Sequence, residues 1–384
     1  MPHLILLEPT DPGPEWAPFA GARPLAELRV GAFRVWERWR RMFGADEVSV
    51  VSPATAAFAD VDSIRLIDQA AIRGPAIVAR STFAPIGADF AVAQGTEGYS
   101  SGGLTVAWVL GPGERWAGPR EVADPVEIKG LRLRAATDLI TGCERLLEDD
   151  CAALRDEVGV VPSGCVVIGD PSLLAVRTAS VEPHVVFDVR KGPIVLEADS
   201  VVRAGTRLEG PVYLGRHSWI LGGAVRHSAI GPHCRVHGEV AHTVFLGYAN
   251  KSHDGFVGHS VIGQWVNLGA GTITSNLKNT YGEVRLELPT GRLATGRINV
   301  GTLFGDHAKT AIGTHLSTGS VIGTGANVAA MAPRYVRPFA WAQHDRQTRD
   351  GFLTVARRVL PRRGVDVTPE IAASLTAIHD RLAR

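Results

Sequence analysis

The sequence predicts two folded parts, an α/β domain followed by a β-helix, and then a helical tail. A six-residue spacing of apolar side chains predicts the β-helix, because a prism of short stacked strands repeats at this period and an amphipathic helix of period 3.6 does not. With 384 residues, 45% of them hydrophobic, the chain can bury two cores. The spaced positions are five in an unbroken run and three later ones in the same phase: Leu196, Val202, Leu208, Leu214, Ile220, Leu316, Ile322 and Val328.

Short apolar runs predict the α/β domain, which we expect to span residues 1–160. An amphipathic helix is expected over residues 24–43, because Pro24 suits a first helical turn and apolar side chains follow at helical spacing. A second helix over 135–157 leads out of this domain. The runs with the length of buried strands are 4–7, 47–51, 75–79 and 104–110.

The β-helix is expected over residues 161–333 and the tail over 334–384. Glycine adopts positive φ at little cost, so glycines beside the aliphatic positions are predicted to form the corners of the prism. Segments 345–359 and 369–382 have helical spacing, and Thr368 can cap the second. We expect these helices to cover the last coil, whose strand edges need protection. The predicted corner glycines are Gly215, Gly231, Gly263, Gly269, Gly313 and Gly323.

Charge and cysteine content exclude several classes of protein. A net charge of +1 argues against a general nucleic-acid or membrane-surface binder. No segment is long and apolar enough to span a bilayer, so a cytoplasmic location is expected. The four cysteines form no CxxC pair, which favours reduced, mostly buried thiols over a disulfide framework or a zinc knuckle.

Polar residues interrupt the repeat between positions 250 and 272. His253 and Asn267 are separated by fourteen residues, so in a stack of short coils they are expected near each other on adjacent coils. Acyl transfer needs such a proximity of polar groups. The alternative is that His253 only packs between coils, in which case its loss would lower stability.

Motifs along nearly the whole chain resemble a family of sugar nucleotidyltransferases. This family is an alternative form of the bifunctional N-acetylglucosamine-1-phosphate uridyltransferase/glucosamine-1-phosphate acetyltransferase. The resemblance implies a nucleotidyltransferase-like (Rossmann-like) α/β domain, a left-handed parallel β-helix that forms homotrimers, and a role in making UDP-N-acetylglucosamine or a related sugar nucleotide. The motifs are Arg23 to Gly31, Gly169 to Ser172, Arg190 to Pro193, Leu208 to Pro211, the His253 stretch and Asn276 to Tyr281.

The resemblance also implies the residues of an acetyltransferase site. His253 would be the general base for the sugar amine, since an imidazole with a pKa of about 6.5 is largely neutral at cytosolic pH. Phe256 and Leu277 replace tyrosines that many relatives carry, and Tyr281 would compensate. Substrate contacts are implied at Arg235, Lys251, Asn267, Asn276 and Tyr281, and acetyl-coenzyme A contacts at Ala270, Thr302 and Arg337.

The N-terminal domain is expected to bind a nucleotide through Arg23 and Arg29. Both flank the predicted helix start, where free N–H groups favour an anion and arginine can bind phosphate bidentately. The resemblance implies nucleoside triphosphate, with UTP favoured, and Mg²⁺. Residues 7–22 lack a glycine-rich phosphate loop, however, and Arg80 stands where a magnesium-binding aspartate is expected.

The expected partners are an amino-sugar phosphate, acetyl-coenzyme A and a nucleoside triphosphate, with no nucleic acid, no membrane and no assigned metal ligand. One alternative is a trimeric zinc hydratase of the γ-carbonic anhydrase kind, to which His237, His242, His253 and His259 would contribute. Another is a non-catalytic sugar-nucleotide-binding protein whose sites have decayed.

Overall fold

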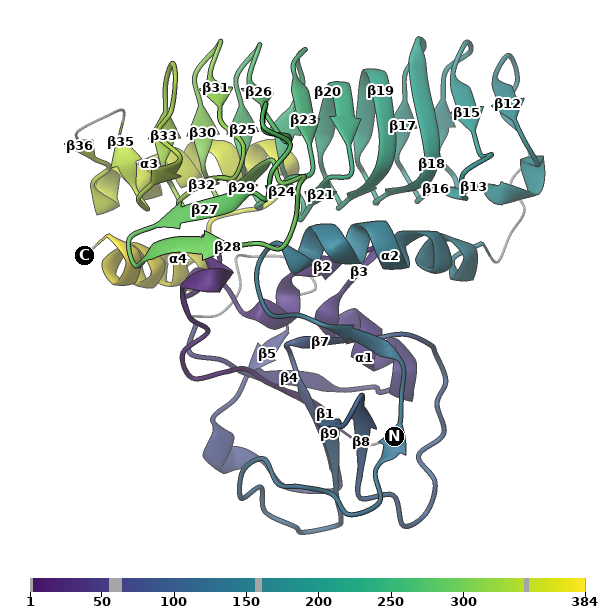
Figure 1. Ribbon diagram of the computed structural model, residues 1–384, viewed down its shortest axis with the longest axis vertical. Helices are drawn as coiled ribbons and strands as arrows, with labels where there is room; N and C mark the ends of the chain where they lie inside the picture. Colours follow the sequence, from purple (N-terminus) through teal and green to yellow (C-terminus); the bar gives the residue numbers. More distant parts are fainter. Residues whose placement is uncertain (1–2, 55–63, 156–160, 342–344, 384) are drawn as a thin grey trace.

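The fold combines an α/β domain, a β-helix and a helical tail (Figure 1). In the computed structural model, the described residues are 3–54, 64–155, 161–341 and 345–383. The expected domain boundary at residue 160 lies outside them. The expected two-part fold with a helical tail is confirmed. Among the described residues, no helix has both the length and the apolar character that crossing a bilayer requires.

The N-terminal domain is built on a mixed seven-stranded sheet. The four predicted runs form its β1, β4, β6 and β9, with order β10-β8-β9-β6-β1-β4-β5. Strand β1 pairs in parallel with β4 and β6, and β9 pairs antiparallel with β6. The strands are β1 (His3–Leu7), β4 (Val48–Val51), β5 (Arg65–Leu66), β6 (Ala76–Arg80), β8 (Gly98–Ser101), β9 (Leu104–Leu110) and β10 (Val126–Glu127), and β7 (Phe83–Pro85) pairs with β11 (Gly130–Arg132) outside this sheet.

The prediction of one helix over residues 24–43 is wrong for the first half of this segment. Residues Leu25–Glu27 form a 3-10 turn, and β2 (Arg29–Val30) and β3 (Phe33–Arg34) form a hairpin before α1 (Val35–Phe43). Gly31 has a φ of +65°, and a side chain there would collide with the Asp150 carboxylate. The helix therefore starts later, where Glu37 caps it by accepting from the Arg34 backbone N–H at 2.6 Å.

The β-helix places one strand of every coil on each of three faces. Ile194 pairs with Val212 and Val201 with Trp219, so one coil takes eighteen residues, or three repeats of six. The domain face packs on the N-terminal domain, the groove face carries the groove described below, and the outer face is the third. Strands β18 (Thr206–Leu214), β19 (Trp219–Ile230) and β20 (Arg235–Ala241) are long enough to continue from one face onto the next.

The remaining strands each belong to one face. The domain face has β13 (Leu174–Val176), β16 (Ile194–Leu196), β21 (Val244–Phe245), β24 (Val261–Ile262), β29 (Thr302–Phe304), β32 (Ser320–Ile322) and β34 (Tyr335–Val336). The groove face has β14 (Ser180–Val181), β17 (Val201–Val202), β22 (Asn250–Lys251), β25 (Asn267–Leu268), β30 (Lys309–Thr310), β33 (Asn327–Val328) and β35 (Ala340–Trp341), the last paired with β36 (Asp345–Arg346). The outer face has β12 (Val166–Ile168), β15 (Val186–Asp188), β23 (Phe256–Gly258), β26 (Ile273–Thr274) and β31 (His315–Leu316).

The predicted apolar positions form the core of the prism. All eight are buried in one cluster. The phase between them is not continuous, because after Ile220 the inward residues are Val225, Ile230, Val236 and Val240, at steps of five, five, six and four. Shortened corners therefore break the six-residue period in the middle of the prism, and the same phase returns later.

The predicted corner glycines have a different role. Of the six, only Gly313 has positive φ, at +65°. The others lie where neighbouring coils touch: a Cβ on Gly215 would lie 2.9 Å from the Gly231 carbonyl carbon, and one on Gly263 would lie 2.7 Å from the Asp306 nitrogen. Aromatic side chains occupy a left-handed corner instead, in a stack of His217, His233, Tyr248, Trp265 and His307.

Two helical segments hold the parts together. Helix α2 (Asp138–Ala153), predicted from the sequence, lies along the β-helix (Figure 1), where the Cys143 thiol donates to the His227 carbonyl. The tail forms α3 (Arg349–Val359), a 3-10 turn (Leu360–Arg363) and α4 (Pro369–Leu382); both helices were predicted, but the first was expected from residue 345, where β36 lies instead. Its apolar side packs on the stacked corner, through contacts that include Phe352 and Trp265. The tail thus covers a corner of the prism, not only its last coil as expected.

An insertion interrupts the coil between β26 and β29. It contains a hairpin of β27 (Arg285–Leu288) and β28 (Gly291–Ala294), and β27 lies against β32 and β34 of the domain face (Figure 1). Arg297 at its end donates to Glu144 of α2 at 2.7 Å. The insertion therefore ties the β-helix to the N-terminal domain.

Candidate functional site

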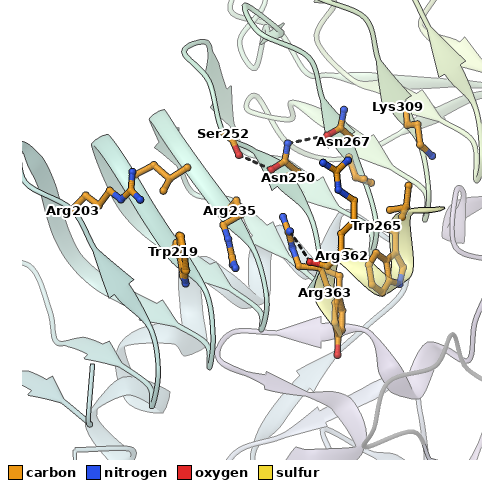
Figure 2. Close-up of a pocket in the computed structure, with 14 residues that line it drawn as sticks. Arg203, Trp219, Arg235, Asn250, Ser252, Trp265, Asn267, Lys309, Arg362 and Arg363 are labelled. Atoms are coloured by element: carbon orange, nitrogen blue, oxygen red, sulfur yellow. Dashed lines mark hydrogen bonds between the residues drawn. The ribbon is translucent and has the colours of Figure 1, made fainter. Parts of the chain in front are cut away.

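A groove of about 580 Å³ runs along the groove face beside the tail. Successive coils contribute outward side chains from the same strand position, and the 3-10 turn of the tail adds two arginines (Figure 2). We call this the basic groove. Its polar and aromatic lining consists of Arg203, Trp219, Arg235, Tyr248, Asn250, Ser252, Trp265, Asn267, Lys309, Arg362 and Arg363.

The basic groove carries five cationic side chains and no acidic lining residue. None of the five has a carboxylate partner among the residues that the structure describes. Burial, and the neighbouring charge of Arg363, lower the pKa of Arg235 to about 10. Burial lowers the pKa of Lys309 to about 8. Like charges held together in a partly buried groove favour binding of an anion.

The indole ring of Trp219 separates two of these cations. The Arg235 guanidinium carbon lies 4.2 Å from the centroid of the Trp219 ring, and that of Arg203 lies 5.7 Å from it. The two arginines come from the coils before and after Trp219 (Figure 2). Arg235 also donates to the His217 carbonyl at 2.8 Å. Its guanidinium is thus oriented before any ligand arrives.

Two amides and a hydroxyl continue the groove on the next coils. Asn250 Nδ2 donates to Asn267 Oδ1 at 2.8 Å, and Ser252 Oγ donates to Asn250 Oδ1 at 2.5 Å (Figure 2). This chain of hydrogen bonds fixes the orientation of Asn250. The Asn267 side chain is exposed and keeps its amide N–H groups for a ligand.

His253 directly follows Ser252, at the corner between the groove face and the outer face, and it is exposed. Lys251 points into the prism, where its ammonium donates to the carbonyls of His237 at 2.6 Å and of His253 at 2.9 Å. Burial lowers the pKa of Lys251 to about 8. Lys251 therefore fixes the backbone at His253 and does not line the basic groove. Asp254 pairs with His237 at 3.2 Å.

Other predicted site residues lie away from the basic groove within one chain. Asn276 lies at the opposite end of the outer face from His253, where its amide contacts His259 Nδ1 at 2.7 Å. Tyr281, in the insertion, is 72% exposed. Of the acetyl-coenzyme A positions, Ala270 follows β25, Arg337 is exposed after β34, and Thr302 is fully buried on the domain face. The structure does not bring these three together on one surface.

Arg23 and Arg29 are both buried and have protein partners. Arg23 Nε donates to Asp306 of the β-helix at 2.7 Å. Arg29 donates to the Ala32 carbonyl, and its guanidinium carbon lies 5.6 Å from the Tyr213 ring centroid. Since α1 begins only at Val35, neither arginine flanks the start of an α-helix, and Arg23 precedes only the short 3-10 turn Leu25–Glu27. Their burial and protein partners favour a structural role, and phosphate binding at Arg23 and Arg29 stays a prediction.

A second polar cluster lies between α2 and the β-helix. Ligand atoms of Glu144, His242 and His259 lie within 4.8 Å of one another, close enough to share a metal ion. Arg297 already donates to both oxygens of Glu144 at 2.7 Å. Burial, then the neighbouring His259 and other cationic groups, lower the pKa of His242 to about 3. His237 belongs to the other end of the outer face, so the four histidines of the hydratase alternative do not converge within one chain.

Sequence reasoning missed Arg203, Trp219, Arg362 and Arg363. The first two could have been found, because Arg203, Trp219 and Arg235 follow one another at intervals of sixteen residues, close to one coil. The tail arginines gave no such signal. They reach the groove only because the tail folds back onto the stacked corner.

The eighteen-residue coils and the α/β domain define a hexapeptide-repeat β-helix protein with an N-terminal α/β domain. The chain matches no family model. It is similar to a bifunctional sugar-1-phosphate nucleotidylyltransferase/acetyltransferase of Sulfurisphaera tokodaii, with 33% identity over 149 residues, or 36% of this chain and 35% of the relative. It is also similar to the bifunctional protein GlmU of Gloeobacter violaceus, with 29% identity over 256 residues, or 60% of this chain and 53% of the relative. These relatives confirm the resemblance, although the chain spans only about a third to a half of their length.

Two solved structures were also matched. One is a hexapeptide transferase family protein from Anaplasma phagocytophilum, with 12% identity and a TM-score of 0.25, covering 52% of this chain and 90% of that one. The other is a UDP-N-acetylglucosamine acyltransferase from Arabidopsis, with 11% identity and a TM-score of 0.27, covering 58% of this chain and 90% of that one.

Proposed function

We propose that the chain is an acetyltransferase that moves the acetyl group of acetyl-coenzyme A onto the amine of an amino-sugar 1-phosphate, of the glucosamine-1-phosphate type. The observation that carries the proposal is the basic groove, which places Arg235 and Asn267 on the coils on either side of that of Asn250 and includes Ser252, the residue before His253. A cation for a phosphate, an amide for hydroxyls and an imidazole for a proton are the groups that this reaction requires. The names of the curated relatives support the same class of reaction.

His253 would act as the general base. As the acceptor nitrogen attacks the thioester carbonyl, a C–N bond forms, the C–S bond breaks, and the imidazole takes the amine proton. The departing thiolate then receives a proton and leaves as free coenzyme A. Lys251 holds the backbone carbonyl of His253 and so positions the base. In this proposal Arg235 binds the sugar phosphate and Asn267 binds the sugar hydroxyls.

The complete site would form between chains of a homotrimer. Asn276 and Tyr281 lie away from His253 within one chain, and a neighbouring subunit could supply them. Exposed apolar side chains on and beside the outer face support an interface there, among them Ile273, Ile312 and Met331. Ala270 and Arg337 reach the surface and stay in the proposal as acetyl-coenzyme A contacts, while Thr302 is covered in this arrangement.

Nucleotidyl transfer is a second proposed activity, giving UDP-N-acetylglucosamine or a related sugar nucleotide from UTP with Mg²⁺. Its support is the mixed sheet with parallel β1, β4 and β6, whose carboxyl ends are where nucleotides commonly bind, together with the names of the relatives. Arg80 ends β6 and donates to the Thr105 carbonyl at 2.8 Å, so this strand end offers a cation where a metal-binding carboxylate was expected. Acetyl transfer is therefore the better supported of the two.

The test is an activity screen of the full chain. Glucosamine-1-phosphate or galactosamine-1-phosphate is supplied with acetyl-coenzyme A and nucleoside triphosphates, and release of thiol and of pyrophosphate is followed separately. Thiol release that depends on the amino sugar supports acetyl transfer. Ligand binding without either product would favour the non-catalytic alternative, and zinc-dependent hydration would favour the hydratase.

A further inference from the structure

The basic groove extends beyond what a sugar monophosphate would occupy. His253 and Asn250 belong to one coil, Arg235 to the coil before it, Trp219 to the one before that, and Arg203 follows the strand of a still earlier coil. Neighbouring strands lie about 4.8 Å apart, so His253 and Arg235 are one coil apart along the axis of the prism, and His253 lies three residues beyond Asn250, the register partner of Arg235. The groove continues for two further coils past Arg235 in the direction of the N-terminus.

The charge of this extension also exceeds that of one phosphate. Arg363 lies close enough to Arg235 to lower its pKa, and Arg363 Nε donates to the His233 carbonyl at 3.3 Å. Arg362 and Arg203 line the same groove, again with no acidic lining residue. The guanidinium groups of Arg235 and Arg363 lie side by side in this part of the groove, Arg203 lies beyond the Trp219 ring, and Arg362 points toward Asn267 (Figure 2). Arginine forks suit phosphate oxygens, and two adjacent phosphates would supply the missing counter-charge.

We propose that the acceptor of this site is an amino sugar linked to a nucleoside diphosphate, with the diphosphate held by Arg235 and Arg363 and with Arg203 beyond it on the nucleoside side. The inference rests on the proposed acetyl transfer, and it makes the nucleotide-linked amino sugar the preferred acceptor over the amino-sugar 1-phosphate. The sugar amine lies at His253, the diphosphate at the arginines, and the nucleoside extends past Arg235 along Trp219 and Leu221. The tail arginines make the C-terminal turn part of the acceptor site.

The experiment compares two acceptors on the full-length chain, UDP-linked glucosamine and glucosamine-1-phosphate, by thiol release from acetyl-coenzyme A. The expected result is a higher kcat/KM for the UDP-linked sugar. Arg363→Gln removes a charge-assisted phosphate contact, so KM for the UDP-linked sugar should rise about tenfold or more. The KM for acetyl-coenzyme A should change by less than about threefold. A change of this size is smaller than the loss of one charge-assisted hydrogen bond would cause.

Arg358→Gln is the matched control, because it removes the same charge from the same tail at an exposed position outside the groove. It should leave every KM unchanged, and melting curves should show that both variants fold. Equal or better use of glucosamine-1-phosphate would overturn the proposal. So would a rise in KM for acetyl-coenzyme A alone, because the arginines would then hold the diphosphate of the donor.

A separate readout distinguishes failure of this inference from failure of the proposed function. If no acceptor is acetylated, the acetyltransferase proposal fails, and calorimetry with UDP alone still tests the groove. Weaker UDP binding in Arg363→Gln and unchanged binding in Arg358→Gln would support a diphosphate site. Equal UDP binding by both variants and the natural chain would place any nucleotide elsewhere and overturn the inference.

Discussion

His253 is exposed at a corner of the prism, and its backbone carbonyl is held by the buried Lys251. We predict that His253→Ala lowers acetyl transfer by about a hundredfold to ten-thousandfold, the usual effect of losing a general base. Because the side chain is exposed, the melting temperature should hardly change. His184→Ala, at another exposed histidine of the β-helix that lies outside the basic groove and away from Ile273 and Met331, is the control and should retain activity. The measurement is thiol release, and a His253→Ala variant within about threefold of the natural chain would end the proposal.

The pair of Arg23 and Asp306 joins the two domains inside the molecule, with both side chains fully buried. Arg23→Ala leaves the Asp306 carboxylate buried without this partner, which typically costs about 3–5 kcal/mol. We therefore predict a large fall in melting temperature. Arg65→Ala removes an exposed pair with Glu47 at 3.8 Å and should cost at most about 1 kcal/mol. A stable Arg23→Ala variant with weakened UTP binding would instead support the sequence-based role of Arg23 in nucleotide binding.

At the scale of single residues, the sequence predicted on which coils the candidate residues lie, but not the partners of the buried side chains. The spacing of His253 and Asn267 placed both on adjacent coils, because coil length is a local property of the repeat. The partner of Arg23 could not be predicted in this way. Asp306 lies far along the chain, and only the packing of the N-terminal domain on the domain face brings the two together.

Among the elements, the coils depend on glycines at which neighbouring turns touch. A Cβ on Gly231 would lie 2.5 Å from the Leu246 carbonyl oxygen, which is backbone and cannot move aside easily. We predict that Gly231→Ala lowers stability by about 1–3 kcal/mol, as overpacking usually does. Gly282→Ala is the control, since its nearest atom would be the Thr280 hydroxyl at 3.7 Å. Thermal unfolding of both variants is the measurement, and equal melting temperatures would show that the coils can separate.

The elements themselves were predictable where a period or a run of apolar residues specifies them. The strands β1, β4, β6 and β9, helix α2 and both tail helices followed from such patterns. The first half of the helix expected over 24–43 did not form, because Gly31 turns the chain into a hairpin beside Asp150. The basic groove was only partly predictable, since the β-helix pattern could place Arg235 but not the fold of the tail that brings Arg363 beside it.

For the whole molecule, the outer face bears on assembly. Ile312 is 78% exposed, Met331 65% and Ile273 43%, and they lie on or beside neighbouring strands of this face. The domain face is covered by the N-terminal domain and one corner by the tail, so apolar exposure on the outer face points to contact with other copies of the chain. Three prisms packed side by side would bury it.

We predict that the chain sediments as a trimer at micromolar concentration and that Ile273→Lys together with Ile312→Lys dissociates it, since buried lysines in an apolar interface are strongly unfavourable. Phe90→Lys is the control, because Phe90 is a similarly exposed apolar residue, at 39%, in the N-terminal domain. If the site needs Asn276 and Tyr281 from a neighbouring chain, the dissociated variant should keep its fold and lose acetyl transfer. If the natural chain sediments as a monomer, the proposed interface is wrong. If a monomeric variant retains full activity, His253 and the basic groove of one chain are sufficient for acetyl transfer.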